Sequence, residues 1–69
     1  MINPKHLAAN LRLAADVRRD CYNRYPDGKM TEAYFTAALI LDSIAVALDG
    51  EGGNPPKYFV DVETGAPIA

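Results

Sequence analysis

The sequence contains a single cysteine, a single histidine and no tryptophan among its 69 residues. Cys21 therefore cannot form a disulfide within the chain, and Cys21 with His6 cannot supply the ligands of a structural zinc site. A lone thiol is typical of a reducing compartment. Because a domain of this length buries only about 60% of its unfolded surface, self-association is the remaining way to stabilise it.

Catalytic motifs are absent as well. The sequence has no glycine-rich loop between a strand and a helix, no serine or cysteine with a candidate base, and no metal-ligand spacing. We interpret His6 as a solvated residue in the first turn of a helix and Cys21 as a small apolar residue. The sequence thus predicts no catalytic, cofactor-binding or metal site, and hence no enzyme.

Charge is distributed unevenly along the chain. Residues 1–29 contain six basic and three acidic residues, a net charge of +3, whereas residues 30–69 contain one basic and six acidic residues, a net charge of −5. The acidic second part disfavours direct binding of nucleic acid and suits a basic partner. No basic region followed by an apolar run opens the sequence, so a cytosolic location is expected.

Two helices are predicted, over residues of about 4–25 and about 31–49. Asn3 is a favourable N-cap for the first helix, the hydroxyl of Thr31 is a candidate cap for the second, and Gly50 is a favourable C-terminal residue. A proline and a glycine lie in the short segment between them. These features predict an all-α fold in which the two helices form an antiparallel hairpin.

The chain is predicted to divide into a helical hairpin at 1–50 and a tail at 51–69. The tail begins with a linker rich in glycine and proline and continues with alternating apolar and polar residues over 58–62, the pattern of a short strand. A single strand pairs with a partner copy, lies on the helices or stays loose. The sequence leaves these three alternatives open.

The first helix contains a stripe of residues at alternating intervals of four and three, which predicts its contact with the second helix. The members of this stripe are Leu7, Leu11, Ala14, Arg18, Cys21 and Tyr25. Arg18 interrupts the stripe, and either it extends its guanidinium outward to solvent or it pairs with a carboxylate across an interface, for which Asp42 is the natural candidate. A neighbouring face is predicted to be solvated and consists of Arg12, Asp16, Arg19 and Asn23.

The second helix has two such stripes, and one helix cannot cover both. The wider one consists of Ala33, Ala37, Ile40, Ile44 and Ala47 with Tyr34, Leu41 and Leu48 beside them, and the other of Phe35, Leu39, Asp42, Val46 and Asp49. We therefore predict a homodimer in which two hairpins form a four-helix bundle. Its core is predicted to contain Phe35, Leu39, Ile40, Ile44 and Val46. A membrane span is not expected, because Asp42 and Ser43 interrupt the apolar run.

Tyrosines gather near the predicted turn of the hairpin. They are Tyr22, Tyr25 and Tyr34. Tyrosine beside arginine is common in ordinary packing and is also enriched in binding hot spots, so both interpretations stay open.

Three segments carry a resemblance to a known family. Residues 1–7 (MINPKHL), residues 25–29 (YPDGK) and the tail from 55 to 69, in a chain of this length, resemble the small anti-quorum-sensing proteins of Mu-like Pseudomonas phages. The resemblance implies an early phage product in the cytoplasm of the bacterial host. It implies that the protein binds the quorum-sensing activator LasR and prevents it from binding DNA, with the pilus assembly ATPase PilB as a second target.

On this hypothesis the chain inhibits its partner stoichiometrically, and acidic groups with aromatic and basic anchors make the contacts. The predicted partner-binding residues are Arg19, Tyr22, Glu32, Tyr34, Asp49 and Glu51. An acidic helical dimer is suited to the basic DNA-reading face of a helix-turn-helix domain. Two alternatives stay open: a helical protein that sequesters a small anionic signal through Arg18, Arg19 and Arg24, and a DNA-binding protein that uses the first helix.

Overall fold

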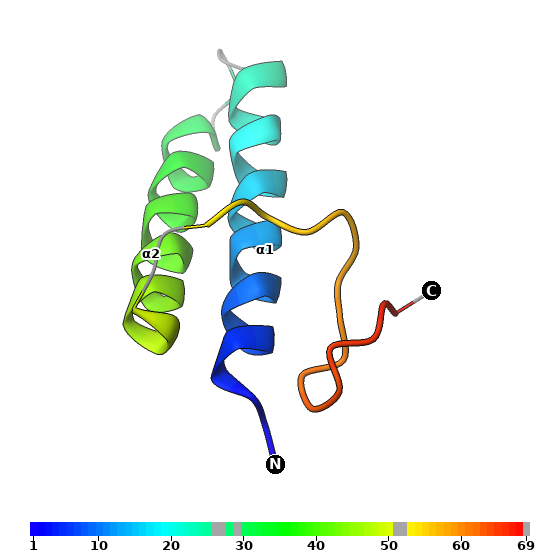
Figure 1. The fold of residues 1–69 in the computed structure, drawn as a ribbon. Helices are drawn as coiled ribbons and strands as arrows, with labels where there is room; N and C mark the ends of the chain where they lie inside the picture. Colours follow the sequence, from blue (N-terminus) through cyan, green and yellow to red (C-terminus); the bar gives the residue numbers. More distant parts are fainter. Residues whose placement is uncertain (26–27, 29, 51–52, 69) are drawn as a thin grey trace.

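The computed structural model describes residues 1–25, 28, 30–50 and 53–68. It contains two helices, α1 at Pro4–Arg24 and α2 at Thr31–Asp49, and no strand among the described residues. The helices lie side by side and run in opposite directions (Figure 1). The predicted all-α hairpin and the approximate limits of both helices are thereby confirmed.

The helix ends follow from local chemistry. The side chain of Asn3 accepts a hydrogen bond from the Lys5 amide at 2.9 Å and caps α1. Gly50 ends α2 with a φ of 71°, a left-handed conformation that glycine adopts without steric cost. Thr31 was expected to cap α2, but its hydroxyl instead bonds the carbonyl oxygens of Tyr25 and Gly28. Thr31 therefore fastens the turn, and α2 begins without a side-chain cap.

Alanines form the contact between the helices. Ala8 and Ala15 of α1 and Ala38 and Ala45 of α2 are each at most 1% exposed, and no large side chain among the described residues is fully buried. Alanine at seven-residue intervals lets two helices approach closely but removes little apolar surface from water. The hairpin therefore has a close internal contact and a small hydrophobic core.

The stripe of α1 that meets α2 is shifted by one residue along the chain from the predicted stripe. It consists of Ala8, Arg12, Ala15, Arg19 and Tyr22, and we call these the seam residues of α1; those of α2 are Phe35, Ala38, Asp42, Ala45 and Asp49. The predicted stripe beginning at Leu7 lies beside the seam. Both stripes have the same intervals of four and three residues, so both satisfy the helical repeat. A shift by one residue rotates the stripe by 100° around the helix axis, onto the neighbouring face. The small alanines and the matching charges select the inner one.

The tail passes across α1 and then lies on the side of that helix away from α2 (Figure 1). The amide group of Asn10 donates to the Val60 carbonyl oxygen at 2.8 Å and accepts from the Val60 amide at 2.8 Å. The Asn3 amide donates to the carbonyl oxygen of Val62. The tail thus lies on the helices, and the predicted strand over 58–62 reduces to one antiparallel bridge between Val60 and Pro67.

We expect Asn10→Asp to release the tail from α1. The substitution removes the donor to the Val60 carbonyl oxygen and places a negative charge beside that oxygen, which should weaken docking by about 1–3 kcal/mol. Hydrogen exchange at the Val60 amide measures the effect. Asn23→Asp makes the same chemical change at an exposed site of α1 and should leave this exchange unaltered. Equal protection in both variants would contradict the role of Asn10.

A turn of the tail is organised by Asp61. Its carboxylate accepts hydrogen bonds from the Thr64 and Glu63 amides, which hold the pKa of the Asp61 carboxyl below the ordinary value of 3.8. The turn closes at Gly65, whose φ of 78° is left-handed and where a Cβ would come within 2.6 Å of Nε2 of His6. The turn and the first turn of α1 are therefore in direct contact.

The lowered pKa of Asp61 predicts how this turn responds to acid. A carboxyl with a lower pKa in the folded state stabilises that state above its unfolded pKa, and the contribution disappears as the pH falls through the lower, folded value. The Thr64 amide resonance should therefore titrate with a midpoint below 3.8. Asp61→Asn should abolish the titration, whereas a midpoint at or above the ordinary value would contradict this description of the turn.

Candidate interaction surface

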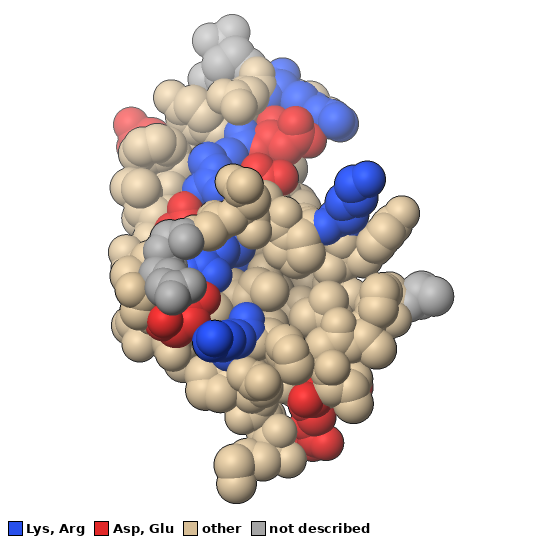
Figure 2. Space-filling view, in the orientation of Figure 1, with Lys and Arg blue, Asp and Glu red and all other residues tan. Residues whose placement is uncertain are grey.

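Basic and acidic side chains are interleaved on the face of the hairpin that the tail crosses (Figure 2). They include two ion pairs that join the helices, Arg12 with Asp49 and Arg19 with Asp42. A third ion pair, between Arg24 and Asp20, lies within α1 and is exposed. Much of the charge on the two helices is therefore compensated within the hairpin.

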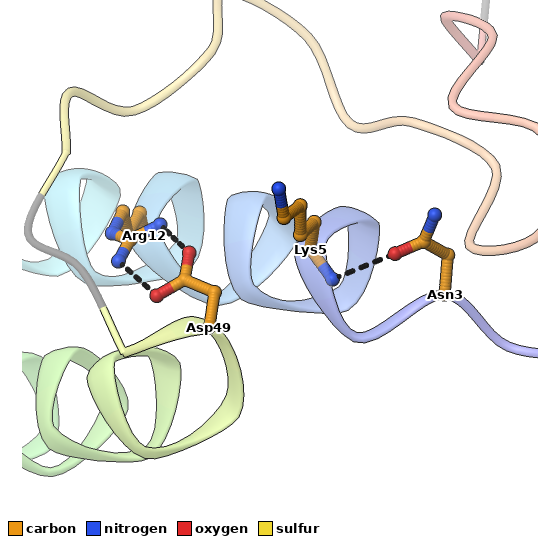
Figure 3. Close-up of polar contacts among 4 residues, drawn as sticks. All are labelled: Asn3, Lys5, Arg12 and Asp49. Atoms are coloured by element: carbon orange, nitrogen blue, oxygen red, sulfur yellow. Dashed lines mark hydrogen bonds and ion pairs between the residues drawn. The ribbon is translucent and has the colours of Figure 1, made fainter.

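The pair of Arg12 and Asp49 is the more buried of the two. Nη1 and Nη2 of the guanidinium donate to the two carboxylate oxygens at 2.6 and 2.9 Å, a bidentate arrangement (Figure 3). The side chains are only 10% and 9% exposed. The tail covers the pair, because a Cβ at Gly53 would lie 3.6 Å from Nη1 of Arg12. Sequence reasoning had placed Arg12 on a solvated face and Asp49 in a partner contact, and both are instead joined inside the hairpin.

Arg19 makes the second pair, where Arg18 had been proposed. The Arg19 guanidinium donates to the carboxylate of Asp42, and the two side chains are each 39% exposed. Arg18 donates from Nη1 to the Ala14 carbonyl oxygen of its own helix at 3.0 Å. Within the chain Asp42 is therefore paired with Arg19 and not with Arg18, and a pair of Arg18 with Asp42 across an interface between copies stays a prediction.

These ion pairs leave the outward side of α2 without charge over most of its length. Between Glu32 and Asp49 the only charged residue of α2 is Asp42, and it is turned toward α1. Five large apolar side chains of this helix are 45–55% exposed: Phe35, Leu39, Ile40, Ile44 and Val46. These are the five residues predicted to form a dimer core, and all of them lie on the surface of the single chain.

A second feature extends the apolar surface onto α1. In both helices the residues one position before each seam residue are mostly apolar. These residues are turned away from the seam by 100° around the axis of their helix, in the same sense along each chain direction. Because the helices are antiparallel, both sets lie on the same side of the hairpin. We call this side the apolar face; it consists of Leu7, Leu11, Ala14, Arg18 and Cys21 of α1 with Tyr34, Ala37, Leu41, Ile44 and Leu48 of α2. Most of these residues are half-buried, and Arg18 is the one charge among them.

The remaining predicted contact residues gather near the turn of the hairpin. The rings of Tyr22 and Phe35 pack with their centroids 5.4 Å apart, and Glu32 is exposed in the first turn of α2. Tyr34 lines a pocket together with Tyr25. Glu51 lies outside the described residues. The structure thus brings Tyr25 and Tyr34 to one pocket and packs Tyr22 on Phe35. It takes Arg19 and Asp49 into ion pairs.

Sequence reasoning missed two residues of this surface. Arg12 could have been found from a signal in the sequence, since Arg12 and Arg19 are spaced by two helical turns and so are Asp42 and Asp49. Met30, which lines the pocket beside the tyrosines, carries no comparable signal. A lone methionine before a helix gives no indication of what it contacts.

Two further properties of the structure concern groups of metal-binding side chains and helices able to span a membrane. Among the described residues no group of three or more histidine, cysteine or acidic side chains could hold a metal ion. α2 is long and apolar enough to span a membrane by length and composition, and 11% of its apolar window is buried. The core helix of a soluble protein, which is mostly buried, passes the same test of length and composition.

Comparison of the chain with protein-family models, with characterised proteins and with solved structures finds no significant match.

Proposed function

We propose that the chain is a non-catalytic interaction protein that dimerises into a four-helix bundle. The observation that carries this proposal is the imbalance of apolar surface: no large side chain is fully buried in the described hairpin, while five large apolar side chains of α2 are about half exposed. Exposed apolar surface of this extent is typical of an interface. Dimerisation would complete the hydrophobic core that a chain of 69 residues otherwise lacks.

We further propose that the dimer inhibits the quorum-sensing activator LasR by binding its DNA-binding domain in the cytoplasm of a bacterial host. The resemblance of residues 1–7, 25–29 and 55–69 to anti-quorum-sensing phage proteins supports this target, and it supports PilB as a second one. Exposed carboxylates suit the basic surface with which a helix-turn-helix domain meets DNA. They include Glu32 and Glu63.

Binding can be tested with the isolated LasR DNA-binding domain and a labelled operator duplex. We expect the protein to co-elute with the domain in size-exclusion chromatography and to release the duplex in fluorescence anisotropy. Glu32→Lys should weaken this binding several-fold, because it reverses an exposed charge, whereas Glu32→Gln should weaken it less. A dimer that neither binds the domain nor releases the duplex would contradict LasR as the target.

The two alternative functions have less support. A site for a small anion requires arginines whose guanidinium groups can bind it. Arg19 pairs with Asp42 and Arg24 with Asp20, so an anion would compete with these carboxylates. A DNA-binding surface on α1 would compete with the same ion pairs. Binding to DNA that falls steeply with salt, in the absence of LasR, would favour this alternative over the proposal.

A further inference from the structure

A pocket of about 300 Å³ lies at the turn of the hairpin. Its described lining residues lie at the end of α1, at Gly28 and in the first turn of α2. The lining residues are Tyr25, Gly28, Met30, Thr31 and Tyr34. Two phenol rings and a flexible thioether chain thus surround the space.

Several backbone groups of the lining residues are bonded to one another. The Gly28 amide donates to the Tyr25 carbonyl oxygen, the Thr31 amide donates to the Gly28 carbonyl oxygen, and the Tyr34 amide donates to the Met30 carbonyl oxygen. The Thr31 hydroxyl bonds the same two carbonyl oxygens of Tyr25 and Gly28. Because none of the described lining residues is charged and the backbone groups named above are bonded to one another, the described walls are mainly apolar and favour an uncharged occupant.

The size and the open shape of the pocket indicate which uncharged group it holds. Its volume is at the lower limit for small-molecule sites, and it is open to solvent on one side. Small ligands usually bury most of their surface, which an open pocket cannot achieve. When a side chain of another protein enters an open pocket, the part that the pocket does not cover is covered by that protein. Tyrosine and methionine are also common in surfaces that receive such anchors.

We propose that this pocket receives one large apolar side chain, such as leucine, isoleucine, methionine or phenylalanine, from the protein that the chain binds. The inference rests on the proposed function as a protein-binding module, and it specifies what the module recognises on its partner. Acidic groups outside the pocket would steer the partner, while the apolar anchor would fix its position.

The pocket can be tested without any partner, because the chain has only two methionines. In protein labelled with ¹³C at the methionine methyl groups, Met30 reports on the pocket and Met1, which is fully exposed, is an internal control. N-acetyl-leucinamide and N-acetyl-phenylalaninamide should shift the Met30 resonance saturably at millimolar concentrations, and the aspartate analogue should not. A Met30 signal that stays in place, or that moves together with Met1, would overturn the proposal.

A second measurement concerns the partner itself. Met30→Ala and Tyr34→Ala should each weaken binding to the LasR DNA-binding domain about tenfold or more, with Tyr34→Phe as a control that keeps the ring. Met30 is exposed and lies outside the seam, so its variant should fold. Unchanged binding in both alanine variants would overturn the anchor while leaving the proposed function intact. Should the wild-type protein not bind the domain, the proposed target is wrong, and the methionine titration still decides on the pocket.

Discussion

Asp49→Ala is expected to reduce the free energy of unfolding by about 3–5 kcal/mol, a large part of what a small domain possesses. The Asp49 carboxylate accepts both hydrogen bonds of the Arg12 guanidinium, and the two side chains are about nine-tenths buried. Removal of the carboxylate leaves the charge of Arg12 buried beneath Gly53 without its bidentate partner. Urea unfolding at a fixed protein concentration measures the loss.

Two matched variants separate the effect of burial from that of pairing. Asp42→Ala breaks the pair with Arg19, which is partly exposed and screened by solvent, so it should cost about 1 kcal/mol or less. The double substitution Arg12→Met with Asp49→Leu removes both buried charges and should recover most of the lost stability. Equal losses for Asp49→Ala and Asp42→Ala would contradict the assignment of Arg12 and Asp49 as the buried pair.

Ile44→Asp is expected to abolish dimerisation and, with it, cooperative folding. Ile44 is about half exposed in the single chain, so an aspartate there can reach solvent and should be tolerated by a stable monomer. In a four-helix bundle the same carboxylate would enter an apolar core without a partner, at a cost of several kcal/mol. We expect the hairpin alone to unfold, because its buried apolar residues, among those described, are four alanines.

Ile44→Val is the matched control for this variant. It keeps a β-branched apolar side chain at the same position and so adds no charge to the predicted core. The control should therefore stay dimeric and keep its melting temperature within a few degrees. Light scattering and thermal unfolding followed by circular dichroism report both properties. A folded, monomeric Ile44→Asp variant would contradict the coupling of folding to dimerisation.

The helices could be predicted from the sequence because their ends depend on local chemistry. Asn3 and Gly50 act as expected, and their effects do not require knowledge of the rest of the fold. The seam of α1 was placed one residue too early, because the leucines of the neighbouring stripe carry the larger hydrophobic signal. What decides the seam is complementarity between helices, in which Arg12 and Arg19 match two carboxylates of α2 at the same spacing.

The position of the tail could not be predicted, because it depends on one side chain that acts in place of a strand. Asn10 offers both a donor and an acceptor to Val60, but an asparagine within a helix is usually solvated. The pocket at the turn was missed for a similar reason. Its tyrosines were noted in the sequence, whereas the contribution of Met30 depends on how the chain turns between the helices.

The central claim is that a second copy completes the core of this protein. Sedimentation equilibrium combined with thermal unfolding over a wide range of protein concentrations tests it most directly. We expect a folded species of twice the 7.5 kDa chain mass, with a melting temperature that rises with concentration. A folded species of the single-chain mass, with a melting temperature independent of concentration, would contradict it.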